Sequence, residues 1–256
     1  MCLVVLAINT HPEYKLIIAA NRDEYYDRPA APLSFWKDVP DLLAGRDLRA
    51  GGTWFGITTS GKLAAITNYR DPLSDKKEAP SRGKLLVDYL SGNEGPDDYL
   101  VKLAGTADCY NGFNLIFGVE KLIYWFSNRG NKFQQLTSGI YGLSNRLLDT
   151  PWPKVLRAKH ALEDILSTQI KPDPEALFHM LCDRSVPHDK YLPDTGVGIE
   201  WERTLSSVFI KSPNYGTRSS TLLFIDLDNQ ATLFERTYNS EFNNAKTIKY
   251  TFMIKG

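Results

Sequence analysis

The chain has 256 residues with 30 acidic and 30 basic side chains, so its formal net charge at pH 7 is zero. This balance argues against a nucleic-acid-binding protein, because neutralising phosphates requires an excess of basic residues on one face. Hydrophobic residues make up 43% of the chain and charged residues 23%, proportions from which a globular core can form without disulfides or metals.

The first apolar segment, residues 3–9, is followed by a second at residues 14–20, with the turn-forming sequence Asn9-Thr10-His11-Pro12 between them. Together they predict a hairpin whose first strand begins at Cys2. The segment lacks the basic residues of a signal peptide and is far shorter than the roughly 20 residues that cross a bilayer. No later segment is long enough, so we expect a cytoplasmic protein without a membrane span.

Strand pairs and helices alternate through the middle of the chain. Prolines near the expected helix starts support the helical interpretation, because a proline fits the first helical turn. The predicted elements are strands at 53–59 and 62–68, helices opening at Pro80-Ser81 and at Pro96, strands at 113–119 and 122–127, and helices at 151–167 and 174–182.

The C-terminal part returns to strand patterns after a segment rich in Pro, Gly and Asp at 183–201, which we expect to be a long loop near a site. Strands at both ends with helices between them indicate antiparallel sheets rather than a βαβ array. There is no repeat or low-complexity linker, so a single domain spanning residues 1–256 is expected. The predicted strands are 205–211, 221–227, 232–237 and 246–254.

Three cysteines, Cys2, Cys109 and Cys182, lie far apart with no CxxC pair. An odd number at such spacing fits reduced thiols in a cytosolic protein better than a disulfide framework. We therefore expect Cys109 and Cys182 to be buried and unpaired, with no part in the chemistry.

Several enzyme motifs are missing. The sequence has no GxGxxG after a strand, no GxxxxGK[ST], no HExxH and no GxSxG. The four histidines have no metal-ligand spacing, so no metal site is expected. A catalytic Cys–His pair stays open, because such partners meet in space rather than in sequence.

Cys2 is the residue whose position suggests chemistry. Initiator methionine is normally removed before a small residue, which would make Cys2 the N-terminal residue. It would then offer a thiol nucleophile and an α-amine whose ordinary pKa of about 7.7–8.0 suits a base. A retained Met1 would block that amine. The alternative is that Cys2 is a small apolar residue at the start of a buried strand.

The second strand ends in the polar sequence Asn21-Arg22-Asp23-Glu24, which by itself could be a solvated turn. Behind Met1-Cys2, it resembles the signature of the NRDE-motif family, also called the transport and Golgi organization family. Similar stretches run in family order across nearly the whole chain. They are Gly45-Arg46-Asp47, Gly51-Gly52-Thr53-Trp54-Phe55-Gly56, Ala65-Ile66-Thr67-Asn68-Tyr69-Arg70, Tyr141-Gly142-Leu143-Ser144-Asn145 and Tyr215-Gly216-Thr217-Arg218-Ser219-Ser220-Thr221.

That family resembles the cysteine N-terminal-nucleophile (Ntn) hydrolases that cleave conjugated bile salts and penicillin V. The resemblance implies an α+β fold, a four-layer αββα sandwich of two antiparallel sheets flanked by helices. It also implies that Cys2 attacks a non-peptide amide and that Asp23 orients the amine of Cys2. Asn68 and Asn145 match the two asparagines that help hold the oxyanion and the nucleophile, and Arg218 matches a late arginine.

These roles are chemically coherent. An asparagine amide can donate to a developing oxyanion, a contribution on the order of 3 kcal/mol per donor. The cation of Arg218 would lower the thiol pKa. The alternatives are that Asn68 and Asn145 are ordinary turn residues and that Arg218 pairs with a carboxylate.

Three further residues, Asn21, Arg22 and Trp54, are expected to bind substrate. The related hydrolases have an arginine where this chain has Ala20, which leaves Arg22 as the substitute. Alternation along the strand should place Arg22 on the opposite face from its two neighbours, Asn21 and Asp23. Trp54 is either presented to a pocket by a tight turn or is a core residue.

The resemblance implies two classes of function. One is a cofactor-free hydrolase acting on a small amide or acyl derivative. The other is a non-enzymatic trafficking protein that binds haem or a lipid or acyl-CoA, in which Cys2 is structural or a ligand. Haem needs an axial His, Cys, Met or Tyr, and the sequence singles out none. In either case the expected partner is a small molecule.

Overall fold

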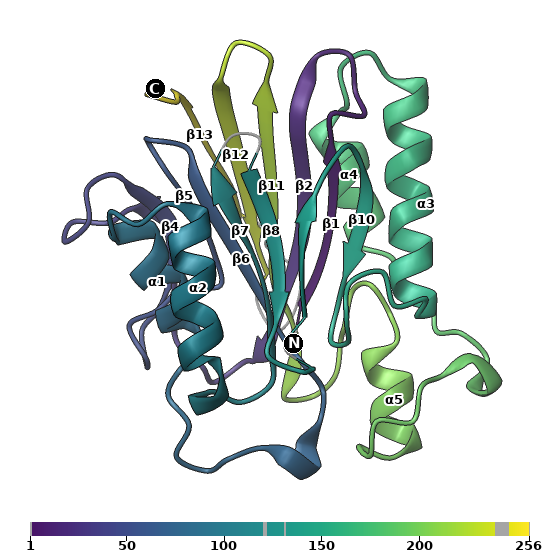
Figure 1. Ribbon diagram of the computed structural model, residues 1–256. Coiled ribbons are helices and arrows are strands. Elements are labelled where there is room, and N and C mark those ends of the chain that lie inside the picture. Colours follow the sequence, from purple (N-terminus) through teal and green to yellow (C-terminus); the bar gives the residue numbers. More distant parts are fainter. Residues whose placement is uncertain (1, 120–121, 131, 239–245, 256) are drawn as a thin grey trace. The chain divides into compact units, whose positions relative to one another are not determined.

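The computed structural model describes residues 2–119, 122–130, 132–238 and 246–255. They form two compact units, the first made of Met1–Asp27 and Ser138–Thr251 and the second of Arg28–Thr137 and Phe252–Gly256. Each unit holds an antiparallel sheet with its own helices, which confirms the α+β class with two antiparallel sheets (Figure 1). The four-layer stacking and the single-domain count remain predictions.

The first unit is built on a sheet whose described strands follow the order β10-β1-β2-β11-β12-β13. The long central strands β2 and β11 have 12 residues each and run side by side. The predicted hairpin is confirmed as β1 and β2. The bounds are β1 Cys2–Ile8, β2 Tyr14–Tyr25, β10 Gly139–Leu143, β11 Tyr215–Asp226, β12 Gln230–Thr237 and β13 Lys246–Met253.

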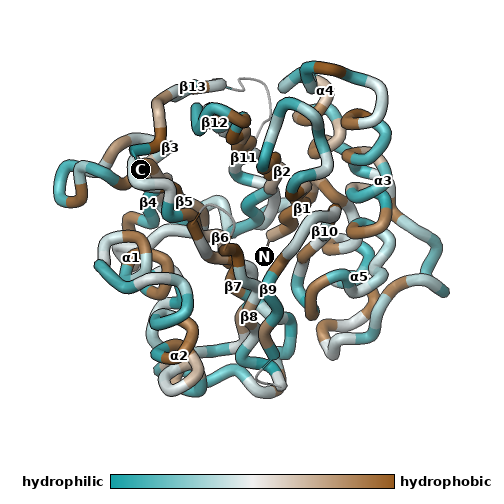
Figure 2. Tube along the Cα trace, turned by 45° about the horizontal axis from the view of Figure 1, so that its top comes forward, coloured by the Kyte–Doolittle hydropathy of each residue, from teal (hydrophilic) through white to brown (hydrophobic). Residues whose placement is uncertain are grey.

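Helices α3 (Pro153–Thr168) and α4 (Pro174–Leu181) lie against this sheet (Figure 1). Alternate strand residues such as Leu3 and Val5 pack with helix residues such as Leu162 to form one core cluster. Figure 2 shows the hydrophobic residues gathered along the strands and the hydrophilic ones in the connecting loops. Both helices begin at a proline, as predicted. The unit also contains α5 (Ile199–Leu205) and the short 3-10 helix η3 (Asp189–Tyr191).

The second unit is a meander in which the described strands follow one another from β3 to β9. Helices α1 (Gly83–Ser91) and α2 (Pro96–Thr106) pack on it through buried residues such as Tyr89 and Tyr99, whose rings contact Phe117. The bounds are β3 Ala30–Phe35, β4 Leu42–Asp47, β5 Phe55–Thr58, β6 Lys62–Asn68, β7 Phe113–Val119, β8 Leu122–Ser127 and β9 Lys132–Leu136, with 3-10 helices η1 Pro72–Ser74 and η2 Ala107–Cys109.

The predicted strand at 205–211 is wrong. Leu205 ends helix α5, and the following apolar run is buried without joining a ladder, apart from one bridge between Lys211 and Gly216. An apolar run reports burial, and burial alone does not separate a strand from a packed loop. The loop predicted at 183–201 is largely confirmed, although η3 and the start of α5 lie within it.

All three cysteines are free: Cys109 is exposed, and Cys2 and Cys182 are partly exposed. The prediction that Cys109 and Cys182 are unpaired is confirmed, but their predicted burial is wrong. In the part of the chain that the structure describes, no helix is long and apolar enough to cross a membrane.

Candidate active site

The start of β1 lies beside the end of β2. Cys2 pairs with Arg22, and Leu3 pairs with Asn21. Directly opposed residues in antiparallel strands project to the same face, so Arg22 shares the face of Cys2. Asn21 and Asp23 project to the other face, as strand alternation predicted. Arg22 therefore lies beside the thiol.

The Cys2 thiol sits in a desolvated environment. Burial raises its pKa, the Asp23 carboxylate adds to the rise, and a hydrogen bond from the backbone N–H of Asp23 and the cation of Arg22 oppose it. Because the net direction is upward, the thiol is protonated at neutral pH. A nucleophilic Cys2 would need a base to take its proton, which is the task of the α-amine in Ntn chemistry.

Thiol reactivity tests this environment. In the chain that retains Met1, whose Cys2 has no free α-amine, we expect iodoacetamide at neutral pH to alkylate the exposed Cys109 well before Cys2, because the thiolate is the reacting form. The rate at Cys2 should rise only at a higher pH than for an ordinary thiol. Peptide mapping by mass spectrometry over roughly pH 6 to 10 measures both rates. In denaturant the three cysteines should react alike, and faster labelling of Cys2 than Cys109 in the folded protein would contradict the expectation.

Asp23 is buried, with 1% of its surface exposed to solvent, and hydrogen bonds fix its position. The hydroxyl of Thr217 donates to Asp23 Oδ1 at 2.7 Å, and the hydroxyl of Tyr215 donates to the Asp23 backbone oxygen at 3.0 Å. Thr217 is itself fixed, because Ile210 N donates to its Oγ1 at 2.9 Å. Burial raises the pKa of Asp23, while the positive charge of Lys154, the Thr217 hydrogen bond and Arg22 lower it.

Lys154 is a site residue that the sequence reasoning missed. It lies at the second position of α3, is 2% exposed and acts electrostatically on Asp23. A lysine in the first turn of a helix opposes the helix dipole and is normally unfavourable there. The unfavourable position of this lysine is the sequence feature that could have indicated a site residue, because a buried cation at such a position requires a nearby anion.

Asn145 is brought to the same end of the first unit's sheet. It follows β10, the neighbour of β1, and is fully buried. Ser144 links it to the candidate nucleophile, since the Ser144 hydroxyl lies 3.1 Å from the Cys2 backbone oxygen and 3.2 Å from Asn145 Oδ1. The structure thus gathers Cys2, Asp23 and Asn145, from three separate strands or strand ends, in one region.

Arg218 occupies a register shift in β11, between Thr217 and Ser219, opposite the end of β2. Its Nη1 donates to the backbone oxygen of Tyr25 at 2.8 Å. Burial lowers the pKa of Arg218 and the nearby cation of Arg22 adds to that fall, while Glu24 opposes it. The two arginines therefore form a basic pair beside the end of β2.

Asn21 uses its side chain to join elements of the fold. Its amide nitrogen donates to the backbone oxygens of Leu181 at 2.8 Å and Val208 at 2.9 Å. Its oxygen accepts from the Ser220 hydroxyl at 2.6 Å. These bonds tie β2 to the end of α4 and to the buried run before Lys211, which favours a structural role over the expected contact with substrate.

We expect Asn21→Ala to lower the free energy of unfolding by roughly 2–5 kcal/mol, because two buried carbonyls lose their donors. Urea unfolding measures the change. The control is Asn214→Ala, an exposed asparagine of the same unit, which should stay within about 0.5 kcal/mol. If Asn21→Ala left stability intact and instead weakened binding of a substrate, the structural interpretation would be wrong.

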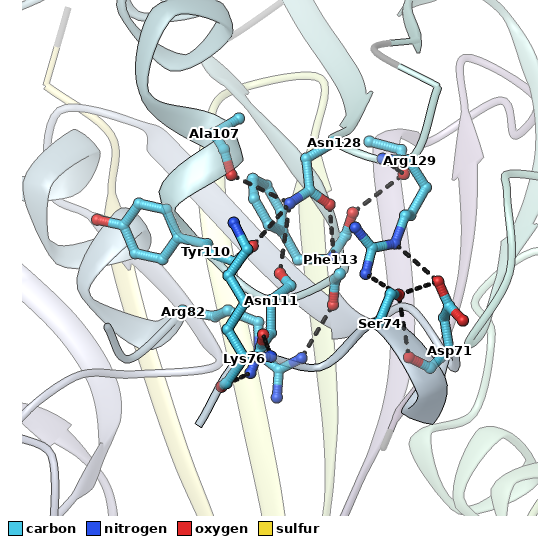
Figure 3. Close-up of polar contacts among 12 residues, drawn as sticks. Asp71, Ser74, Lys76, Arg82, Ala107, Tyr110, Asn111, Phe113, Asn128 and Arg129 are labelled. Atoms are coloured by element: carbon cyan, nitrogen blue, oxygen red, sulfur yellow. Dashed lines mark hydrogen bonds and ion pairs between the residues drawn. The ribbon is translucent and has the colours of Figure 1, made fainter. Parts of the chain in front are cut away.

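Asn68 ends β6 in the second unit, partly exposed and paired with Phe113. Figure 3 shows polar contacts in the neighbouring turns, among them those of Phe113, the strand partner of Asn68. There the Asn128 amide donates to three backbone oxygens, and Arg129 bonds the Ser74 hydroxyl at 2.7 Å and Asp71 at 3.3 Å. The convergence of Asn68 with Cys2 remains a prediction.

Trp54 packs against the core cluster of the second unit. Its backbone oxygen accepts from Ile66 N at 3.0 Å. A Cβ at Gly45 would lie 2.4 Å from the Trp54 ring, so that position admits only glycine while the ring stays in place. These contacts favour the core interpretation of Trp54 over presentation to a pocket.

In the described ranges, no group of three or more His, Cys, Asp or Glu residues could hold a metal ion. The Cys2 region brings together a thiol, a fixed carboxylate with a buried lysine acting on it, and the amide of Asn145.

Comparisons with known proteins identify relatives over the full length. The model of the family described as Transport and Golgi organisation 2 matches residues 1–240. The chain is 37% identical to a Transport and Golgi organization protein 2 homolog of Bos taurus and 36% identical to that of Homo sapiens, each match covering 100% of both chains. A mutant conjugated bile acid hydrolase from Clostridium perfringens is similar in structure, with a TM-score of 0.46 and 12% identity over 100% of this chain and 97% of that chain.

Proposed function

This chain belongs to the Transport and Golgi organisation 2 family, and we propose that it is an N-terminal cysteine hydrolase cleaving a small non-peptide amide or a related acyl derivative. The observation that carries the proposal is that the Asp23 charge acts on the Cys2 thiol and that Ser144 links Cys2 to Asn145, at one end of the first unit's sheet. A terminal thiol, a carboxylate to orient its amine and an amide donor are the parts that acyl transfer requires.

In this mechanism, removal of Met1 frees the α-amine of Cys2. The amine takes the thiol proton as sulfur attacks the substrate carbonyl, and Asn145 donates to the resulting oxyanion. The carbon–nitrogen bond then breaks, the departing amine takes the proton, and a thioester remains on Cys2. Water, deprotonated by the α-amine, attacks the thioester and releases the carboxylic acid, and the proton returns to the thiol.

Asp23 and its neighbours support this sequence by position. The carboxylate is fixed by Thr217, and Lys154 favours its ionised form. An ionised Asp23 accepts a hydrogen bond from the α-amine and holds it toward the sulfur.

The test is hydrolysis of a panel of N-acyl amides by the wild-type protein and by Cys2→Ser. We expect turnover of one or more short or medium acyl amides by the wild type and a loss of at least about a hundredfold in Cys2→Ser, since the hydroxyl is a far weaker nucleophile. Cys109→Ser is the matched control and should keep full activity. Equal activity in wild type and Cys2→Ser would contradict the proposal.

A second candidate function is binding without cleavage, as a haem or lipid and acyl-CoA carrier. The raised pKa of the Cys2 thiol favours it, because a protonated, buried thiol is poorly reactive. Titration with haem and with an acyl-CoA tests this candidate. Saturable binding combined with no turnover of any amide, and with Met1 still present, would favour the carrier over the hydrolase.

A further inference from the structure

A pocket of about 260 Å³ opens in the first unit, between α5 and the ends of β2 and β11. We call it the aromatic pocket. It is lined by Tyr25, Glu200, Trp201, Thr204, Ser212, Pro213, Asn214 and Tyr215. Of its residues, Tyr215 also contacts the candidate active site, through its hydrogen bond to the Asp23 backbone oxygen.

Three aromatic residues dominate this pocket. The Tyr25 ring stands at 78° to the Tyr215 ring with centroids 5.2 Å apart, and the Trp201 ring also stands at 78° to it with centroids 6.1 Å apart. Tyr25 is 51% exposed and Trp201 42% exposed, so both present large apolar area to solvent. Exposed aromatic surface that lines a concavity is a recognised mark of a binding site.

The ring geometry selects the shape of a ligand. A flat aromatic ligand that stacks on the Tyr215 ring could not also stack on Tyr25 or Trp201, because each of those rings stands at 78° to Tyr215. A rounded cation can contact more than one at once, and each ring face attracts positive charge through its quadrupole.

The charges around the pocket agree with a cation. Glu200 is the one charged residue in its lining. Arg203 on α5 pairs with Glu200 at 2.5 Å and with Asp189 at 2.6 Å. The cation of Arg203 is thus shared between two carboxylates, so it does not fully neutralise Glu200 at the pocket.

We propose that the aromatic pocket binds a quaternary ammonium group. Such a group is rounded, carries a permanent positive charge and needs no hydrogen-bond acceptor, which suits a lining of ring faces with an acidic rim. The inference does not depend on hydrolysis at Cys2.

The pocket lies next to the candidate active site. Tyr25 is two residues beyond Asp23 in β2, and the Tyr215 hydroxyl donates to the Asp23 backbone oxygen. Two residues of strand span about 7 Å. Tyr215 therefore takes part in both places, through its hydroxyl at Asp23 and as part of the pocket's lining.

The experiment is isothermal titration calorimetry of the 256-residue protein. The ligands are choline and 3,3-dimethylbutan-1-ol, the neutral isostere of choline, and no acyl substrate is present. We expect saturable one-to-one binding of choline and an affinity for the neutral isostere at least about tenfold lower. Equal affinities would show a merely apolar pocket, and no binding of choline would also overturn the proposal.

Substitutions in the lining test whether choline binds in the aromatic pocket. Tyr25→Ala and Trp201→Ala should each weaken choline binding about tenfold, while Tyr25→Phe, which keeps the ring, should bind like the wild type. Glu200→Gln should weaken it only about two- to threefold, because that carboxylate is exposed to solvent and screened. Tyr191→Ala is the control, an aromatic that is 60% exposed and outside the pocket lining. An equal loss in Tyr191→Ala would place the effect elsewhere.

Discussion

Replacing Lys154 by methionine is expected to lower the free energy of unfolding at neutral pH by about 3–5 kcal/mol. Lys154 and Asp23 are 2% and 1% exposed, and the lysine lowers the pKa that burial raises at Asp23. Methionine fills similar space but removes a buried cation that stabilises the buried Asp23 carboxylate, which is costlier than losing an exposed ion pair.

The cost should depend on pH in a defined direction. The pKa of Asp23 in the folded protein is raised, so the stability linked to it is present at low pH and lost as pH rises through that pKa. Without Lys154 this pKa rises further. The cost of Lys154→Met should therefore be smallest below about pH 4, where the carboxyl is protonated in both folded and unfolded chains, and largest near neutrality.

Urea unfolding at acidic and neutral pH measures both effects. Lys159→Met is the matched control, because Lys159 lies on the same helix and pairs with Asp149 at 2.6 Å while partly exposed. It should cost less than about 1 kcal/mol. An equal cost for Lys154→Met at both pH values would mean that the lysine stabilises by packing and not through Asp23.

The second large effect is kinetic. Asn145→Ala should lower kcat of the proposed hydrolase by about 10²–10³, with KM changed only a few-fold, because an oxyanion donor acts mainly in the transition state. Asn145 is fully buried and linked to Cys2 through Ser144, so the site geometry depends on it. Steady-state kinetics on the substrate found for the wild type gives both constants.

The Asn145→Asp variant distinguishes the loss of the hydrogen-bond donor from a change in side-chain shape. The aspartate has nearly the same volume but carries no N–H group and adds negative charge near the oxyanion. Its kcat should fall at least as far as that of Asn145→Ala. If Asn145→Asp kept most of the activity, Asn145 would be a structural residue and the oxyanion donor would lie elsewhere.

Much of the fold could be predicted because its elements bury residues with clear periodicity. The hairpin from Cys2 and the strands β7 and β8 follow apolar runs, and α3 and α4 start at prolines. The strand β9, with sequence KFQQL and four exposed residues, has no apolar pattern to detect. The run at 208–210 misled the prediction because its burial comes from tertiary packing.

The candidate site was predictable in part for a similar reason. Cys2 begins β1, Asp23 lies near the end of β2 and Asn145 follows β10, and short motifs mark all three. Lys154 could not be assigned without the packing of α3, because its partner lies more than a hundred residues earlier. The structural role of Asn21 could not be predicted either. Its amide donates to two backbone oxygens of distant segments, and the sequence does not separate such a residue from one that binds substrate.

Intact mass spectrometry tests most directly whether Cys2, once N-terminal, is the nucleophile. The protein is incubated with a p-nitrophenyl ester of a short acyl chain, quenched in acid, weighed and mapped. We predict a chain lighter by one methionine residue that carries a single acyl group on Cys2, with no such adduct in Cys2→Ala. A chain that keeps Met1, or acyl groups on Cys109 at the level found on Cys2, would contradict the account.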